Sequence, residues 1–209
     1  MKNEFFNSTI SPRLDLYKTS SVRLTFPSLS SIRRIENNNL PNSTARFIAE
    51  GACDRGIYTA VQYRQGYILY FPKQEMSELG ISFEFTGCIM AQFCCNGTYY
   101  IAHIYLEPGH DTRQDWNNFV QNAAVDLNNQ FSDFILFKPC CSVVKDHYEQ
   151  HFIPGQVTIS VCGIIEGNSC YSAIMDMNNC TLLYSVRIND VKSVIGALNN
   201  QNFNNVIIN

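Results

Sequence analysis

The pair Asn96-Gly97 limits the possible folds of this chain more than any other feature, because it lies between two apolar, strand-like runs. The first run covers Ile81–Phe93 and the second covers Thr98–Leu106. Asn-Gly favours a type I′ turn, which has positive φ at both central residues and matches the twist of two antiparallel strands. The sequence therefore predicts a β-hairpin centred on this pair, and the turn sets which residues face each other.

Short apolar runs on both sides of this hairpin predict further strands. They are rich in aromatic and β-branched residues and are bounded by Gly, Pro or Asn. The runs before the hairpin are Ala45–Gly51, Gly56–Tyr63 and Tyr67–Phe71, and those after it are Phe134–Lys138, Gln156–Ile165, Cys170–Met177 and Thr181–Ile188. We expect the last three runs to form an antiparallel meander.

Helical periodicity is limited to three segments. One segment has apolar residues at the spacing of a single buried helix face, namely Trp116, Phe119, Val120, Ala123, Ala124 and Leu127. A second helix is predicted over Ser142–His151, and a third from a cap at Asp190 through Leu198. Strands outnumber helices, so the predicted class is α+β, with mainly antiparallel or mixed sheets in a sandwich-like core flanked by helices.

Composition limits the domain plan and the classes of partner. Residues 1–44 are rich in Ser, Asn and Pro and predict an N-terminal leader or docked arm, whereas 45–209 predicts one catalytic domain. A net charge of −3 and a pI near 5.8 argue against direct nucleic-acid binding. No run reaches the roughly 20 apolar residues of a membrane span. The start also lacks the apolar stretch of a cleavable signal peptide, so we expect any export to use another route.

The chain has nine cysteines and no Cys-x-x-Cys pair. An odd count is typical of reduced thiols, and the spacing does not fit a zinc site. His147 and His151 could share a helix face and hold a metal, but they are not part of a His-Glu-x-x-His motif, and a solvated helix face is the favoured interpretation. His110 is interpreted as an ordinary surface residue. We therefore predict neither a metal nor a cofactor.

Cys88 and His103 form the candidate chemical site. Counted outward from the turn, His103 faces Met90 and Cys88 faces Tyr105, so the two side chains share one face as diagonal neighbours about 7–8 Å apart. An adjacent imidazole can take the thiol proton and leave a strong nucleophile. The alternative is an ordinary pair of core residues.

Two further roles follow from this chemistry. Thr86 and Gly87 are the candidates for contacting the substrate, and backbone N–H groups near Gly87 could stabilise the oxyanion formed by attack on a carbonyl. Ser82, six residues before the cysteine, is the candidate for the group that orients the imidazole.

The segment Phe85-Thr86-Gly87-Cys88, followed by a turn and Tyr100-Ile101-Ala102-His103, resembles the active-site segment of the bacterial glutamine-deamidase toxins. These include the catalytic domain of cytotoxic necrotizing factor and the Burkholderia lethal factor. The resemblance implies that Cys88 is the nucleophile, His103 the base and Ser82 the orienting group. Thr86 stands where Ser is usual and Ser82 where Thr is usual, and the likeness is confined to the segment between Ser82 and His103.

The resemblance also implies a target. A toxin of this kind is made in the bacterial cytoplasm and is secreted or translocated into the host cytoplasm. There it deamidates one glutamine of a host protein. The target is either eukaryotic initiation factor 4A, whose deamidation arrests translation, or a Rho-family GTPase, which is locked active. Two alternatives remain from the residues. One is a Cys-His peptidase or transglutaminase-like acyl transferase, and the other is a non-enzymatic β-rich interaction protein.

Overall fold

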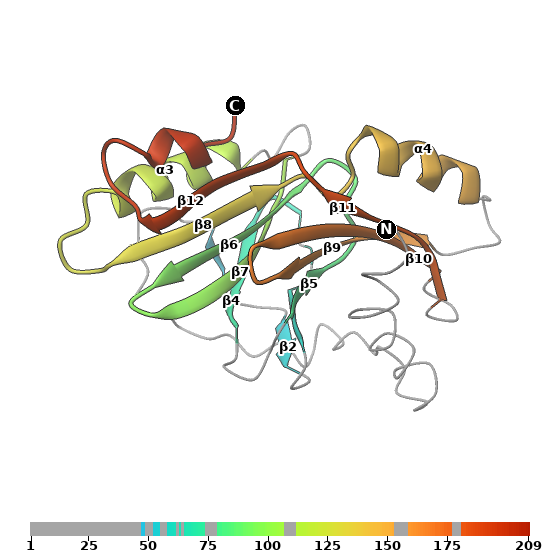
Figure 1. Cartoon of the computed structure of the whole chain (residues 1–209), viewed down its shortest axis with the longest axis horizontal. Helices are drawn as coiled ribbons and strands as arrows, with labels where there is room; N and C mark the ends of the chain where they lie inside the picture. Colours follow the sequence, from blue (N-terminus) through green and yellow to red (C-terminus); the bar gives the residue numbers. More distant parts are fainter. Residues whose placement is uncertain are drawn as a thin grey trace.

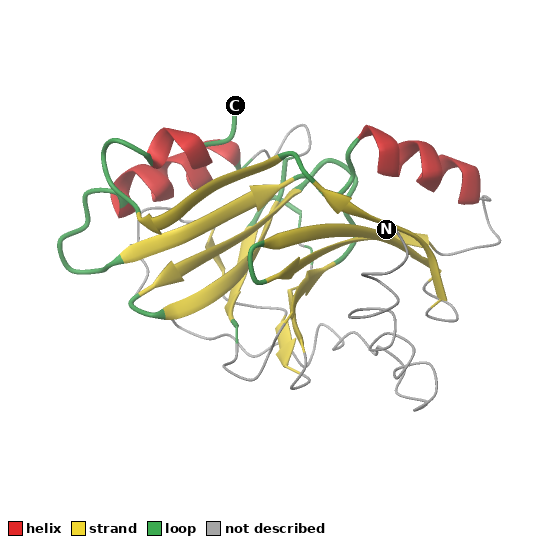
Figure 2. Cartoon of the chain, viewed as in Figure 1, coloured by secondary structure: helices red, strands yellow, loops and turns green. Residues whose placement is uncertain are grey.

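Two six-stranded β-sheets pack face to face, and helices cover the outside of this sandwich (Figure 1). The computed structural model describes residues 47–48, 52–54, 58–61, 63, 65–73, 79–106, 112–152, 159–176 and 181–209. The leader predicted over residues 1–44 lies outside them, as does His110. The predicted α+β class, with mainly antiparallel or mixed sheets flanked by helices, is confirmed (Figure 2).

The first sheet has the order β1 (Phe47–Ile48), β4 (Ile68–Pro72), β7 (Thr98–Ile104), β6 (Ile89–Cys95), β8 (Phe131–Phe137) and β12 (Val191–Ala197). The second has the order β11 (Thr181–Ile188), β10 (Ser169–Asp176), β9 (Ile159–Glu166), β5 (Leu79–Ser82), β3 (Tyr58–Val61) and β2 (Ala52–Asp54). Neighbouring strands are antiparallel except for β1 with β4 and β3 with β5, which are parallel. The helices are α3 (Arg113–Ala123), α4 (Ser142–His151) and the 3-10 helix η3 (Phe203–Val206).

The hairpin predicted at Asn96-Gly97 is confirmed. The φ angles of Asn96 and Gly97 are 51° and 81°, as a type I′ turn requires. Strands β6 and β7 leave this turn with Met90 opposite His103, which is the expected register. The turn chemistry therefore determines which face of the sheet His103 occupies.

The prediction of a single strand over Ile81–Phe93 is wrong, because two strands share this range. Ser82 ends β5 in the second sheet, Ile89 begins β6 in the first, and residues 83–88 cross between the two sheets. Glu84 has a φ of 63°, an uncommon value for a non-glycine residue, which allows the chain to turn within this apolar run. Ser82 therefore ends a strand of the second sheet, whereas Cys88 directly precedes a strand of the first.

The helix predicted from Asp190 through Leu198 is also wrong, because Val191–Ala197 forms β12 along β8. Val194 is buried in this strand, but Ile195 is 62% exposed. Gly196 has a φ of 82° and donates its N–H to Oδ1 of Asp133 at 2.8 Å. Hydrogen bonds to a neighbouring strand thus outweigh a helical spacing of apolar residues.

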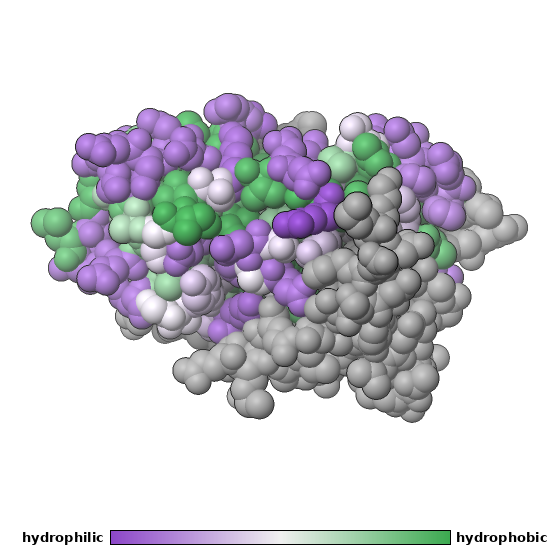
Figure 3. Space-filling model, in the orientation of Figure 1, coloured by the Kyte–Doolittle hydropathy of each residue, from purple (hydrophilic) through white to green (hydrophobic). Residues whose placement is uncertain are grey.

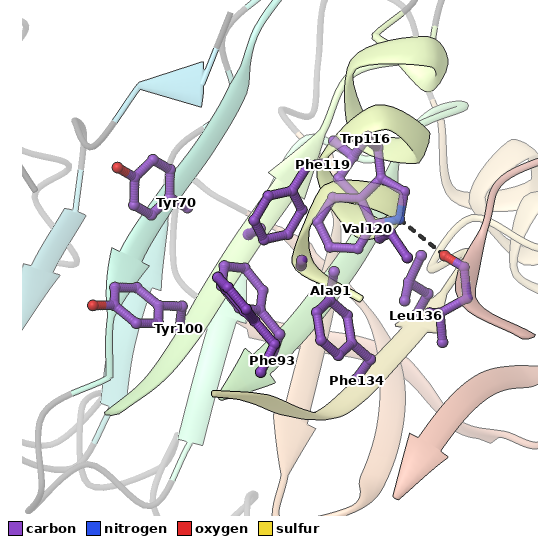
Figure 4. Packing of buried hydrophobic residues seen from close by; sticks show 14 of the residues in the cluster. Tyr70, Ala91, Phe93, Tyr100, Trp116, Phe119, Val120, Phe134 and Leu136 are labelled. Atoms are coloured by element: carbon purple, nitrogen blue, oxygen red, sulfur yellow. Dashed lines mark hydrogen bonds between the residues drawn. The ribbon is translucent and has the colours of Figure 1, made fainter. Parts of the chain in front are cut away.

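Helix α3 covers the outer face of the first sheet (Figure 4). Its buried residues are Trp116, Phe119, Val120 and Ala123, as the periodicity predicts, and they pack on Phe93 and Phe134 of the sheet. The indole N–H of Trp116 donates to the carbonyl oxygen of Val206 at 3.0 Å, which ties α3 to η3. Leu127, expected on the same buried face, lies beyond the end of α3 and is 99% exposed.

Among the described residues, none of the helices combines the length and the apolar character needed to cross a bilayer. Hydrophilic and hydrophobic residues are interspersed over the described part of the face in Figure 3. The predicted helix over Ser142–His151 is confirmed as α4, which lies at the end opposite α3 in Figure 1 and buries Val144 in the cluster between the sheets.

Candidate catalytic site

The structure brings Ser82 and His103 together across the sandwich. Ser82 is the last residue of β5 in the second sheet, and His103 lies near the end of β7 in the first. The hydroxyl oxygen of Ser82 is 2.8 Å from Nδ1 of His103, and both side chains are buried. The group proposed to orient the imidazole therefore reaches it from the opposite layer.

A missing side chain at Gly80 explains this close approach. A Cβ atom on Gly80 would lie 2.6 Å from Cγ1 of Ile101 and still nearer to its Cδ1. Real Cβ atoms do not tolerate such contacts, so only glycine lets the Ile101 side chain pack against the backbone of β5. Side chains two residues apart on a strand share a face, so Ser82 and His103 meet one pleat further along.

The partners of Ser82 determine the tautomer of His103. The Ser82 hydroxyl donates to the carbonyl oxygen of Val61 at 2.6 Å, and a carbonyl oxygen can only accept. A hydroxyl has one proton, so the 2.8 Å contact with Nδ1 is a hydrogen bond donated by the imidazole. Nδ1 therefore carries the ring proton, and Nε2 presents its lone pair. This is the tautomer that a general base acting through Nε2 requires.

The surroundings of the imidazole keep it neutral. His103 is 1% exposed, and burial lowers its pKa from 6.5 to about 3. The ring of Phe85 stacks on the imidazole with centroids 4.2 Å apart and planes 4° apart. Tyr63 contacts it edge-on at 5.5 Å. These two rings exclude water, and desolvation disfavours the charged imidazolium.

Cys88 lies directly before β6, in the same buried cluster as Met90, Ile101 and Tyr105, and is 0% exposed. It thus lies in the layer between the sheets, as does His103. Within the described residues, Nε2 of His103 has no hydrogen-bond partner, so the expected thiol–imidazole hydrogen bond is not formed in this structure. Such bonds are often long in enzymes without substrate, and the role of Cys88 as nucleophile stays a prediction.

The residues between Ser82 and Cys88 are held against β9 of the second sheet. The backbone N–H of Glu84 donates to Oγ of Ser160 at 3.0 Å, and that of Phe85 donates to the Val161 carbonyl oxygen at 3.1 Å. Thr86 is exposed and Gly87 is partly buried. Their proposed roles in contacting substrate and stabilising an oxyanion stay predictions.

A pocket of about 600 Å³ lies beside this segment, between it and α4. Its walls include Phe85, Thr86, Cys141, Ser142, Lys145 and Val161. Neither Cys88 nor His103 lines it. Sequence reasoning missed Phe85, the residue shared by the pocket and the imidazole, because an aromatic residue in an apolar run looks like any core residue.

The described residues contain no group of three or more His, Cys, Asp or Glu side chains arranged to hold a metal ion. His147 of α4 instead stacks on Tyr184 with ring centroids 3.8 Å apart, and His151 is exposed. The seven cysteines whose side chains are described are all outside disulfide bonds, and Cys141 is the only one of these seven that is not fully buried.

No protein-family model matches this chain, and neither a curated protein nor a solved structure matches it. The contacts among Ser82, His103 and Phe85 supply the physical basis for a functional proposal.

Proposed function

We propose that this chain is a cysteine-dependent deamidase of protein glutamine, with Cys88 as the nucleophile, His103 as the general base and Ser82 as the residue that positions the imidazole. The observation that carries the proposal is the chain of buried hydrogen bonds from His103 Nδ1 to Ser82 and on to Val61. These bonds hold the ring proton on Nδ1 and leave the lone pair of Nε2 available. A histidine that must accept a proton at Nε2 needs this tautomer.

In the first half of the reaction, Nε2 takes the proton of the Cys88 thiol, and the thiolate attacks the carbonyl carbon of a glutamine side chain. The carbonyl π electrons move to oxygen. Backbone N–H groups around Gly87 and Cys88 stabilise the resulting oxyanion. The positive charge on the imidazole is shared with Ser82 through the Nδ1 hydrogen bond.

In the second half, the oxyanion collapses and the C–N bond breaks as Nε2 returns its proton to the leaving nitrogen, which departs as ammonia. A water molecule then attacks the thioester while Nε2 accepts its proton, and the C–S bond breaks. The thiolate recovers the proton from Nε2. The net change is carboxamide plus water to carboxylic acid plus ammonia, so the reaction needs no metal and no cofactor.

The substrate in this proposal is a host protein reached in the host cytoplasm after secretion or translocation. The resemblance of the Cys88 and His103 segments to the glutamine-deamidase toxins supports this class. Eukaryotic initiation factor 4A and a Rho-family GTPase are the two candidates. Loss of the GTPase glutamine removes the group that orients the attacking water, and loss of the initiation-factor glutamine arrests translation.

The test is to incubate the purified chain with a eukaryotic lysate and to map modified residues by peptide mass spectrometry. We expect conversion of one glutamine to glutamate in one protein. Cys88→Ser and His103→Ala should abolish it, whereas Cys94→Ser, which alters another buried thiol of the same hairpin, should not. New chain termini would instead identify a peptidase, and incorporation of an added primary amine an acyl transferase. An unchanged lysate would refute an enzymatic role on these proteins.

A further inference from the structure

The ring of Phe85 lies between two features that a catalytic site would need to connect. It forms part of the wall of the pocket of about 600 Å³, and it stacks on the imidazole of His103. Phe85 itself is 1% exposed. Phe85 is therefore in contact with both the pocket and the imidazole.

The imidazole stacked on this ring has one nitrogen, Nε2, whose hydrogen bonding needs explanation. Within the described residues, Nε2 of His103 has no hydrogen-bond partner although the side chain is 1% exposed. Buried polar atoms are normally paired, and an exception asks for an explanation. A group that enters from outside and hydrogen-bonds to Nε2 would supply one.

The backbone of Phe85 is held by β9, and the same residue borders the pocket. The N–H of Phe85 is bonded to Val161 of β9, and a Cβ atom added to Gly163 of that strand would lie 3.1 Å from Cε2 of the ring. The ring therefore packs closely against Gly163. The pocket is bordered by Phe85 and by Val161 of β9, and its volume is in the range of small-ligand sites, about 300–1,000 Å³.

From these contacts we propose that Phe85 is the gate of the catalytic site. Its side chain separates the pocket from His103, and rotation of the ring into the pocket admits a primary carboxamide, the side chain of the substrate glutamine, to Cys88 and His103. The inference rests on the proposed function of these two residues and adds how the site is opened.

Opening would also change the chemistry of the base. Burial behind the rings of Phe85 and Tyr63 holds the pKa of His103 well below its ordinary value. When the Phe85 ring leaves, water and substrate reach the imidazole, the desolvation is relieved, and its pKa rises towards the ordinary range. The imidazole thus becomes an effective base as the substrate arrives.

The first test uses the unmodified chain. Iodoacetamide, which is itself a small primary carboxamide, is added at several urea concentrations below the unfolding transition, and alkylation of each cysteine is followed by peptide mass spectrometry. Cys162 is the internal reference, because it is 0% exposed and lies within β9. Rotation of one ring exposes little surface, so alkylation of Cys88 should hardly change with urea, whereas that of Cys162 should rise steeply. Rates that rise in parallel for both thiols would overturn the gate.

The second test compares Phe85→Leu with Phe83→Leu, a change of the same kind in a buried phenylalanine that does not line the pocket. If the open state is a minor one of about 1–10%, Phe85→Leu should raise the alkylation rate of Cys88 about tenfold, and Phe83→Leu should leave it within about twofold. An unchanged rate in folded Phe85→Leu would refute the gate. If Phe85→Leu does not fold, the urea experiment on the unmodified chain decides. Alkylation needs no protein substrate, so a chain that shows the gate but leaves glutamines unchanged refutes only the proposed function.

Discussion

Replacing Ser82 by alanine tests the hydrogen-bonded chain on which the proposed site depends. The change removes one oxygen atom that bonds to two buried groups, the carbonyl oxygen of Val61 and the Nδ1–H of His103. Neither group has access to bulk water at this position, because Val61 and His103 are 0% and 1% exposed. The variant leaves one acceptor and one donor without this partner.

The expected loss of stability follows from these two groups. A buried polar group left unsatisfied costs about 1–3 kcal/mol, and partial relaxation around the small cavity should reduce the sum to about 2–4 kcal/mol. Ser172→Ala is the matched control, since Ser172 is equally buried and its hydroxyl bonds to the carbonyl oxygen of Pro139 but not to a histidine. The control should lose about 1–3 kcal/mol and leave His103 unaffected.

Stability is measured by urea unfolding with the fluorescence of Trp116, the single tryptophan, which lies on the far side of the first sheet. The tautomer of His103 is read from long-range proton–nitrogen NMR spectra, assigned with His103→Gln. The unmodified chain should carry the proton on Nδ1, and Ser82→Ala should show a mixture of tautomers. Deamidation should fall about ten- to a hundredfold, or roughly 1.4–2.7 kcal/mol of transition-state stabilisation, which is less than for Cys88→Ala.

Two results would refute this reasoning. A proton on Nε2 of His103 in the unmodified chain would show that Ser82 does not set the tautomer. A Ser82→Ala variant as stable as the unmodified chain would show that the two bonds contribute nothing to folding.

Three further predictions concern the framework of the site. Gly80→Ala should lower the free energy of unfolding by about 1–3 kcal/mol, since the new methyl group collides with Ile101. In the double variant with Ile101→Ala, the two losses of unfolding free energy should be less than additive, and strict additivity in urea unfolding would count against the contact. Burial lowers the pKa of His103 to about 3, whereas in the unfolded chain it titrates near 6.5, so the contribution of His103 to the free energy of unfolding should be complete above pH 6.5 and fall by about 1.4 kcal/mol per pH unit as the pH drops from 6.5 to 3. This pH-dependent contribution should be absent from His103→Gln, and identical slopes of the free energy of unfolding against pH in the two proteins would contradict it. Gly97→Ala should cost about 1 kcal/mol through its φ of 81° alone, as no atom lies within 4 Å of the added Cβ, and a loss several times larger would reject the turn assignment.

Local chemistry made the hairpin predictable, and long-range pairing made other elements unpredictable. The Asn96-Gly97 turn needs only its own two residues, so its conformation and the facing of Met90 and His103 followed from the sequence. By contrast, Val191–Ala197 becomes a strand because β8 offers it hydrogen bonds, which no spacing of its own residues reveals.

The candidate site was predictable to a similar extent. A hydroxyl residue before Cys88 could be singled out as the partner of His103, but its place in the other sheet could not. Residues 83–88 alternate apolar and polar side chains up to Gly87, as a continuing strand would, and the crossing depends on contacts with β9. Phe85 was missed for the same reason. Its contact with His103 depends on a crossing between layers that apolar periodicity does not encode.

The division of the site between the two sheets also sets when it forms during folding. Ser82 and His103 belong to different sheets, so each sheet can pair its own strands without creating the hydrogen bond between them. The site is completed only when the two layers dock and expel the water between them. A compact intermediate with its strands formed but its layers loose, such as an acid molten globule, would therefore be inactive despite a native-like content of secondary structure.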